Sequence, residues 1–175
     1  MSFASIIEPV RGANRLSRRE LYHWRLFAPE GGMVESNSGI TVAAAPASAL
    51  EQSSFDLVVV CAASHAEQRR FRPVEETLRR LARHNVALAA VSTGSFVLAR
   101  AGLLTDRRCT VHWDYADSFA EAFPDIALCP TGGVTLQNFE AYFAAGAALV
   151  GVGNDILDLA ALDAGDIGRA AAHAR

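Results

Sequence analysis

Short apolar runs alternate along the chain with segments whose apolar residues recur at helical spacing. Strands buried in a parallel sheet are near-continuous apolar runs, whereas helices repeat apolar positions every three to four residues. Crossover segments of this length force neighbouring strands to run parallel. The pattern therefore predicts an α/β fold with one doubly wound, largely parallel sheet. Its main strands are expected at Leu57–Cys61, Ala87–Val91, Cys109–His112, Ile126–Cys129 and Ala147–Val152.

The N-terminal part predicts a helix over residues 3–16, because apolar residues line one face of that segment. Strands follow at Tyr22–Ala28 and Ile40–Ala44, towards an edge of the sheet, and residues 45–54 are predicted as a loop. A further helix spans 71–81. Glu75–Arg79 and Glu76–Arg80 are expected to pair on its solvent face.

Residues 87–96 form the most informative stretch, since the apolar run breaks at Ser92-Thr93-Gly94 and helical spacing then resumes. A buried strand that turns sharply into a helix is where α/β proteins place a nucleophile or a bound anion. The alternative is an ordinary strand–helix joint with a hydroxyl cap. We expect Ser92 to lie at a ligand-sized crevice at the carboxyl ends of the strands.

Composition narrows the classes of function. The 175 residues are 51% hydrophobic with a net charge of −3, which predicts a folded domain and disfavours a nucleic-acid surface. Cys61, Cys109 and Cys129 lie far apart and match neither a metal nor a disulfide spacing. No apolar run approaches the ~18 residues of a membrane span. We therefore expect a cytoplasmic protein without cofactor, metal or membrane attachment.

All sixteen basic residues are arginine, and the chain has no lysine. A Schiff base forms between a carbonyl substrate and a lysine amine. Schiff-base chemistry through a lysine is therefore excluded for this chain.

Several segments of residues 2–123 together form a family pattern. They are Phe3-Ala4-Ser5-Ile6-Ile7-Glu8-Pro9, Ala13-Asn14-Arg15, Leu57–Cys61, Ser92-Thr93-Gly94-Ser95-Phe96, Leu98–Leu104 and His112-Trp113. With these segments, residues 2–123 resemble the sensing domain of GlxA-type regulators, in the ThiJ/PfpI, or class I glutamine-amidotransferase-like, superfamily. The resemblance implies a flavodoxin-like, three-layer ligand-sensing domain that precedes an AraC-type helix-turn-helix pair, and a possible homodimer.

This sequence departs from the family pattern at the site. Enzymes of the superfamily carry cysteine at the elbow, where this chain has Ser92, and a serine hydroxyl needs an adjacent base. The family's first strand and its acidic residue would precede Ser2. Ser92 and His112 are thus weak catalytic candidates, and we expect Ser92, Thr93, Gly94 and His112 to contact a small-molecule ligand instead.

The last quarter of the chain carries a second set of matching residues, Pro130-Thr131-Gly132-Gly133-Val134, Asn138, Ala145-Gly146-Ala147 and Val150-Gly151-Val152-Gly153. With them it resembles the final two βα units of KDPG aldolases, which are (β/α)8 barrels whose last two loops hold the substrate phosphate. The resemblance implies phosphate binding at Thr131, Gly132, Gly133, Gly153 and Asn154, while the missing lysine excludes aldolase activity. The alternative is that these glycines only make tight turns.

The two resemblances meet at Phe123-Pro124-Asp125. The chain is therefore interpreted as a chimera in one α/β domain of residues 1–175, in which a quarter barrel completes the sheet. A natural recombinant, an engineered splice and a gene-prediction artefact stay open as origins.

Three functions remain. The first is a non-catalytic small-molecule-binding domain related to a regulator's sensing domain, without direct DNA binding and with a possible weak phosphate site. The second is a Ser92/His112-dependent amidase, hydratase or glyoxalase-like enzyme. The third is an engineered fold with no selected function.

Overall fold

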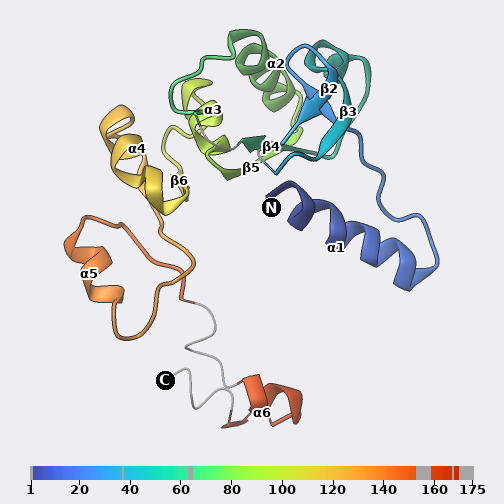
Figure 1. The fold of residues 1–175 in the computed structure, drawn as a ribbon. Coiled ribbons are helices and arrows are strands. Elements are labelled where there is room, and N and C mark those ends of the chain that lie inside the picture. The colour runs from blue at the N-terminus through green and yellow to red at the C-terminus, as the bar shows by residue number, and fades with distance from the viewer. Residues whose placement is uncertain (1, 37, 63–64, 153–158, 167, 170–175) are drawn as a thin grey trace. The chain divides into compact units, whose positions relative to one another are not determined.

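The computed structural model describes residues 2–36, 38–62, 65–152, 159–166 and 168–169 (Figure 1). The chain divides into two compact units, Met1–Thr105 and Asp106–Arg175. Both units mix helices with short sheets, so the predicted α/β class is confirmed. In the described residues none of the helices is long and apolar enough to span a membrane.

The first unit opens with α1 (Ser2–Ser17), which confirms the predicted N-terminal helix. The Asn14 side chain holds the chain that follows, because its Oδ1 accepts the backbone N–H groups of Leu21 and Tyr22 at 2.8 and 2.9 Å. The predicted strand Tyr22–Ala28 is reduced to β1 (Phe27–Ala28), since only these two residues find a partner strand.

A small three-stranded sheet follows, with the strand order β1-β3-β2. β2 (Gly32–Glu35) pairs antiparallel with β3 (Thr41–Pro46), and β1 pairs parallel with β3. The predicted strand Ile40–Ala44 corresponds to β3, whereas β2 was not foreseen. The predicted loop 45–54 was also wrong in part, because Ala47–Gln52 forms the 3-10 helix η1.

β4 (Leu57–Ala62) and β5 (Ala87–Ser92) confirm two predicted strands and their parallel direction. Their register runs from Leu57↔Ala87 to Ala62↔Ser92. α2 (Arg72–Arg83) connects them, and α3 (Gly94–Arg100) follows β5. Both strands therefore end at the same edge of the sheet, directly before α3 begins.

The core of this unit lies between the helices and one face of the β4–β5 pair. Leu81 of α2 clusters with Ala47 and Leu50 of η1, and Val58 and Leu88 of the strands pack against them. The prediction that both strand faces are buried was wrong, since Leu57 is 53% exposed and Cys61 is exposed. A parallel sheet is buried on both faces only where helices cover both faces, and in the described residues the face that carries Leu57 and Cys61 stays accessible at these two positions.

The second unit contains β6 (Arg108–Cys109), the 3-10 helix η2 (Trp113–Tyr115), α4 (Ala116–Ala122), β7 (Ala127–Leu128), α5 (Phe139–Ala144) and α6 (Leu159–Asp163). β6 and β7 are parallel. Phe119 of α4 is completely buried, and its ring centroid lies 5.0 Å from that of Phe123.

The strands predicted in this unit are shorter than expected. Cys109–His112 is reduced to β6, Ile126–Cys129 to β7, and Ala147–Val152 to a single parallel bridge between Thr131 and Gly151. The described residues thus form three separate sheets, where one continuous sheet was predicted. Apolar runs identify extended segments, but pairing depends on the neighbour that each segment meets.

Candidate functional site

Ser92 is the last residue of β5 and adopts the left-handed backbone conformation, with φ +56°. Such a conformation costs an L-residue other than glycine roughly 1–2 kcal/mol. The turn is tight, because the Ser95 hydroxyl donates to the Ser92 carbonyl at 3.3 Å and the Phe96 N–H donates to the Thr93 carbonyl at 3.1 Å. The predicted sharp turn from strand to helix at Ser92 is therefore confirmed.

The two residues after Ser92 explain why the turn is so sharp. Thr93 is completely buried. A Cβ on Gly94 would lie 2.3 Å from the Val60 carbonyl oxygen, so only glycine lets α3 approach β4 this closely. Because packing fixes Thr93 and Gly94, the chain changes direction at Ser92. The Ser92 side chain is half-buried at the carboxyl edge of the sheet.

The register brings a thiol to the same edge. Ala62 lies opposite Ser92, and Cys61 lies opposite Val91. Partial burial raises the pKa of the Cys61 thiol. Reactive cysteines have a lowered pKa, and the shift at Cys61 is in the opposite direction. Sequence reasoning missed this neighbour, although the rule that parallel strands end together would have found it.

His112 lies in the second unit, directly before η2. Its Nδ1 accepts the Asp114 backbone N–H at 3.3 Å and lies 3.6 Å from the Asp114 carboxylate. The histidine thus caps η2. Ser92 and His112 belong to different units, and their role as weak catalytic candidates stays a hypothesis.

The glycine loop of the second unit, at Gly132 and Gly133, is open where the elbow at Ser92 is tightly packed. Gly132 and Gly133 have φ of +79° and +71°, and no atom lies within 4 Å of a Cβ added to either. Asn138 closes the loop, since its Oδ1 accepts the Thr135 N–H at 2.7 Å and its Nδ2 donates to the Gly133 carbonyl at 2.9 Å.

The structure describes part of the predicted phosphate site. α5 begins at Phe139, so Gly133 does not lead directly into a helix. The parallel bridge of Thr131 with Gly151 sets the two glycine segments side by side. Gly153 and Asn154 lie outside the described residues.

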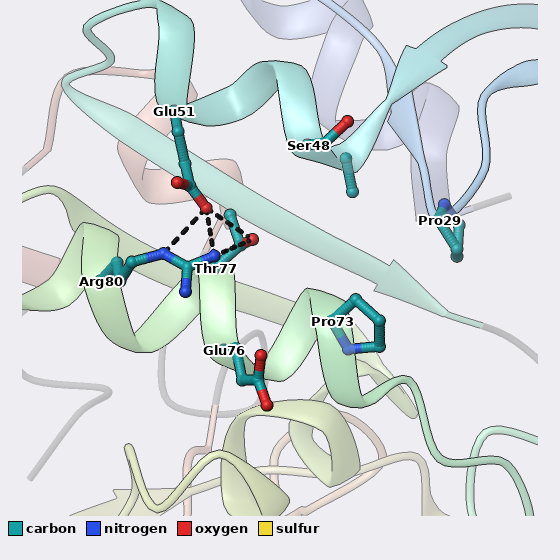
Figure 2. Close-up of a pocket in the computed structure, with 8 residues that line it drawn as sticks. Pro29, Ser48, Glu51, Pro73, Glu76, Thr77 and Arg80 are labelled. Atoms are coloured by element: carbon teal, nitrogen blue, oxygen red, sulfur yellow. Dashed lines mark hydrogen bonds and ion pairs between the residues drawn. The ribbon is translucent and has the colours of Figure 1, made fainter.

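A cleft of about 290 Å³ lies between η1 and α2 in the first unit (Figure 2). On one side Glu51 binds Arg80, whose Nε donates to the Glu51 Oε1 at 2.8 Å, and the Thr77 hydroxyl donates to the same oxygen at 3.0 Å. Sequence reasoning missed this cleft. The residues that line it are Pro29, Ala47, Ser48, Glu51, Pro73, Glu76, Thr77 and Arg80.

Both ion pairs predicted along α2 were wrong. Arg80 binds Glu51 of η1 instead of Glu76. Glu75 points inward, where it is only 2% exposed, and its carboxylate accepts the Phe71 N–H and an Arg70 guanidinium N–H, each at 3.3 Å. The buried carboxylate thereby satisfies a backbone donor at the start of α2.

Among the described residues, no group of three or more His, Cys, Asp or Glu side chains is arranged to hold a metal ion. The DJ-1/PfpI family matches residues 5–127, which is most of the chain and includes the elbow at Ser92. The chain belongs to the DJ-1/PfpI family. A second family, KDPG and KHG aldolase, matches residues 114–172. The two matches share residues 114–127, which contain the junction predicted near 123–125.

Curated relatives of this DJ-1/PfpI chain are regulators. It is 42% identical over 127 residues to the HTH-type transcriptional regulator GlxA of Rhizobium meliloti, covering 72% of this chain and 39% of that protein. It is 38% identical over 129 residues to the HTH-type transcriptional regulator GbdR of Pseudomonas aeruginosa, covering 73% and 35%. The chain thus spans well under half the length of these relatives.

The fold is also similar to a solved structure. A crystal structure of an AraC family transcriptional regulator from Pseudomonas putida superposes with a TM-score of 0.59 at 27% identity, covering 68% of this chain and 64% of that one.

Proposed function

We propose that this chain is a non-catalytic small-molecule-binding domain, related to the ligand-sensing domains of AraC-family transcriptional regulators. The observation that carries the proposal is the strained backbone of Ser92 at the carboxyl end of β5. Strain of this kind persists where the surrounding structure enforces it and is concentrated at ligand and active sites. Ser92, Thr93 and Gly94 are the proposed contacts.

Two observations favour binding over catalysis. The curated relatives are named as transcriptional regulators. In addition, the elbow carries a serine, Ser92, and a serine hydroxyl is a weak nucleophile unless a base lies next to it.

A ligand screen with residue-level readout tests this proposal. Small neutral, cationic and anionic metabolites are screened by thermal shift, and hits are mapped by amide NMR shifts. We expect shifts around Ser92–Gly94. Ser92→Ala should change the Kd less than about tenfold and leave stability within about 1 kcal/mol.

Two results would contradict the proposal. Hydrolysis of an amide or ester substrate that is abolished in Ser92→Ala would make the domain an enzyme. A sequence-specific shift of duplex DNA at physiological salt would show direct DNA binding.

A weak phosphate site in the second unit is a second candidate, with Thr131, Gly132, Gly133, Gly153 and Asn154 as its residues. The observation that favours it is the parallel bridge of Thr131 with Gly151, because both glycine segments must leave neighbouring parallel strands at the same end. Backbone N–H groups would bind the anion without a lysine, so affinity should be low. Millimolar phosphate that leaves the Gly133 amide unmoved would show that the glycines only make turns.

A further inference from the structure

The cleft between η1 and α2 shares no residue with the Ser92 elbow. Its charged side chains form two groups, the Arg80–Glu51 pair and Glu76. In one part Arg80 is held by Glu51 and Thr77, since its guanidinium donates to the Glu51 Oε1 and, at 3.2 Å, to the Thr77 hydroxyl. Arg80 and Glu51 therefore neutralise each other, which leaves little positive charge to attract an anion.

Glu76 supplies the other part. In the described residues it takes part in none of the recorded hydrogen bonds or ion pairs, and its side chain is exposed. The Glu51 Oε2 also lacks a recorded hydrogen bond there, since every bond to that carboxylate goes to Oε1. With two carboxylates and one guanidinium, the cleft carries a net charge of about −1 at neutral pH.

The remaining lining is apolar or small. Pro29 and Pro73 present rings without N–H donors, and Ser48 adds one hydroxyl (Figure 2). Ala47 also lines the cleft and is buried. A volume of about 290 Å³ is just below the range of small-molecule pockets, about 300–1,000 Å³. The complementary molecule is small, with a positive charge and a short hydrocarbon part.

We propose that this cleft binds a small protonated primary amine. The ammonium group donates to the Glu76 carboxylate, and the hydrocarbon part packs against Pro29 and Pro73. The Arg80–Glu51–Thr77 network forms the opposite boundary of the cleft. This site is independent of the proposed ligand site at Ser92.

The test compares two probes of equal size. The wild-type chain is titrated at pH 7 with n-butylamine, which is protonated there, and with neutral n-butanol, while amide NMR shifts are followed. We expect n-butylamine to shift amides of Ser48, Glu76 and Thr77, and n-butanol to shift them less. Because salt screens exposed charges, the amine shifts should weaken as ionic strength rises.

Glu76→Gln removes the charge and keeps the side-chain shape, and it should weaken n-butylamine binding about two- to fivefold, as expected for an exposed ion pair. Glu35→Gln makes the same change on the exposed strand β2 and should leave binding unaltered. The proposal is overturned if n-butanol gives equal shifts, if Glu76→Gln binds as wild type does, or if no cleft amide moves at about 0.1 M amine, above which the amine's own ionic strength screens the attraction.

Discussion

Each unit of the molecule contains a turn of small residues after a strand, and glycine has a different role in each. At Gly94 the backbone is tightly enclosed, since an added Cβ would lie 2.3 Å from the Val60 carbonyl oxygen. At Gly132 and Gly133 there is open space, and glycine is favoured only by the positive φ. Similar sequence patterns thus produce a packed elbow in one unit and an open loop in the other.

The largest effect is expected for Gly94→Ala. The added methyl group meets a backbone oxygen of β4, which cannot move aside as a flexible side chain could. We expect a loss of about 3 kcal/mol in the free energy of unfolding, typical of overpacking in a rigid core. Urea unfolding followed by circular dichroism measures this loss.

The matched control is Gly12→Ala in the middle of α1, where no atom lies within 4 Å of an added Cβ. This change should raise stability by up to about 1 kcal/mol, because alanine favours a helix more than glycine does. Equal effects of the two substitutions would refute the close packing of Gly94.

A smaller loss is expected for Gly132→Ala in the open loop. No neighbour obstructs the methyl group, so the cost comes only from holding alanine at φ +79°. That cost is about 1–2 kcal/mol. The same urea experiment measures it, and a loss as large as that of Gly94→Ala would mean that this loop is also tightly packed.

Features that depend on local sequence could be predicted, and those that depend on distant partners could not. The elbow at Ser92 followed from an apolar run, a Ser-Thr-Gly break and a resumed helical pattern, all within ten residues or so. The partner of Arg80 could not be predicted in this way, because Glu51 lies 29 residues earlier on another element. The cleft was missed for the same reason, since separate segments line it.

Strand lengths in the second unit show the same limit. The apolar residues of 147–152 predicted a strand, yet only Gly151 forms a bridge, to Thr131. An apolar run predicts that a segment will be extended, but a neighbour must supply the hydrogen bonds. In the first unit β4 and β5 meet along six residues each, and there the predicted strands were confirmed.

Relief of the backbone strain at Ser92 should raise the free energy of unfolding modestly, whereas Gly94→Ala and Gly132→Ala should lower it. Ser92→Gly removes the cost of holding serine at φ +56°, while the more flexible unfolded chain offsets part of this gain. We expect a rise of about 0.5–1 kcal/mol in the free energy of unfolding. A fall would show that the hydroxyl contributes more to stability than the strain costs.

The smallest effect concerns the ion pair that borders the cleft. Hydrogen bonds from Arg80 and Thr77 hold the pKa of Glu51 below its usual value. A carboxyl whose folded-state pKa is lowered stabilises the fold above its unfolded-state pKa, about 4.3, and loses that contribution as the pH falls through its folded-state pKa. The effect on stability is small because solvent screens this ion pair, whose side chains are 40% exposed for Glu51 and 43% for Arg80.

Urea unfolding of the wild type and Glu51→Gln between about pH 2 and 7 measures this contribution. The wild type should be the more stable above about pH 5, and the difference should vanish at the acid end and shrink in high salt. Glu8→Gln is the matched control. The Arg11 hydrogen bond also lowers the pKa of Glu8, but that pair lies within α1. The Glu51 pair joins η1 to α2 and must break on unfolding, so its pH-dependent difference should exceed that of Glu8. A difference that persists at the acid end would mean that the carboxylate charge is not its source.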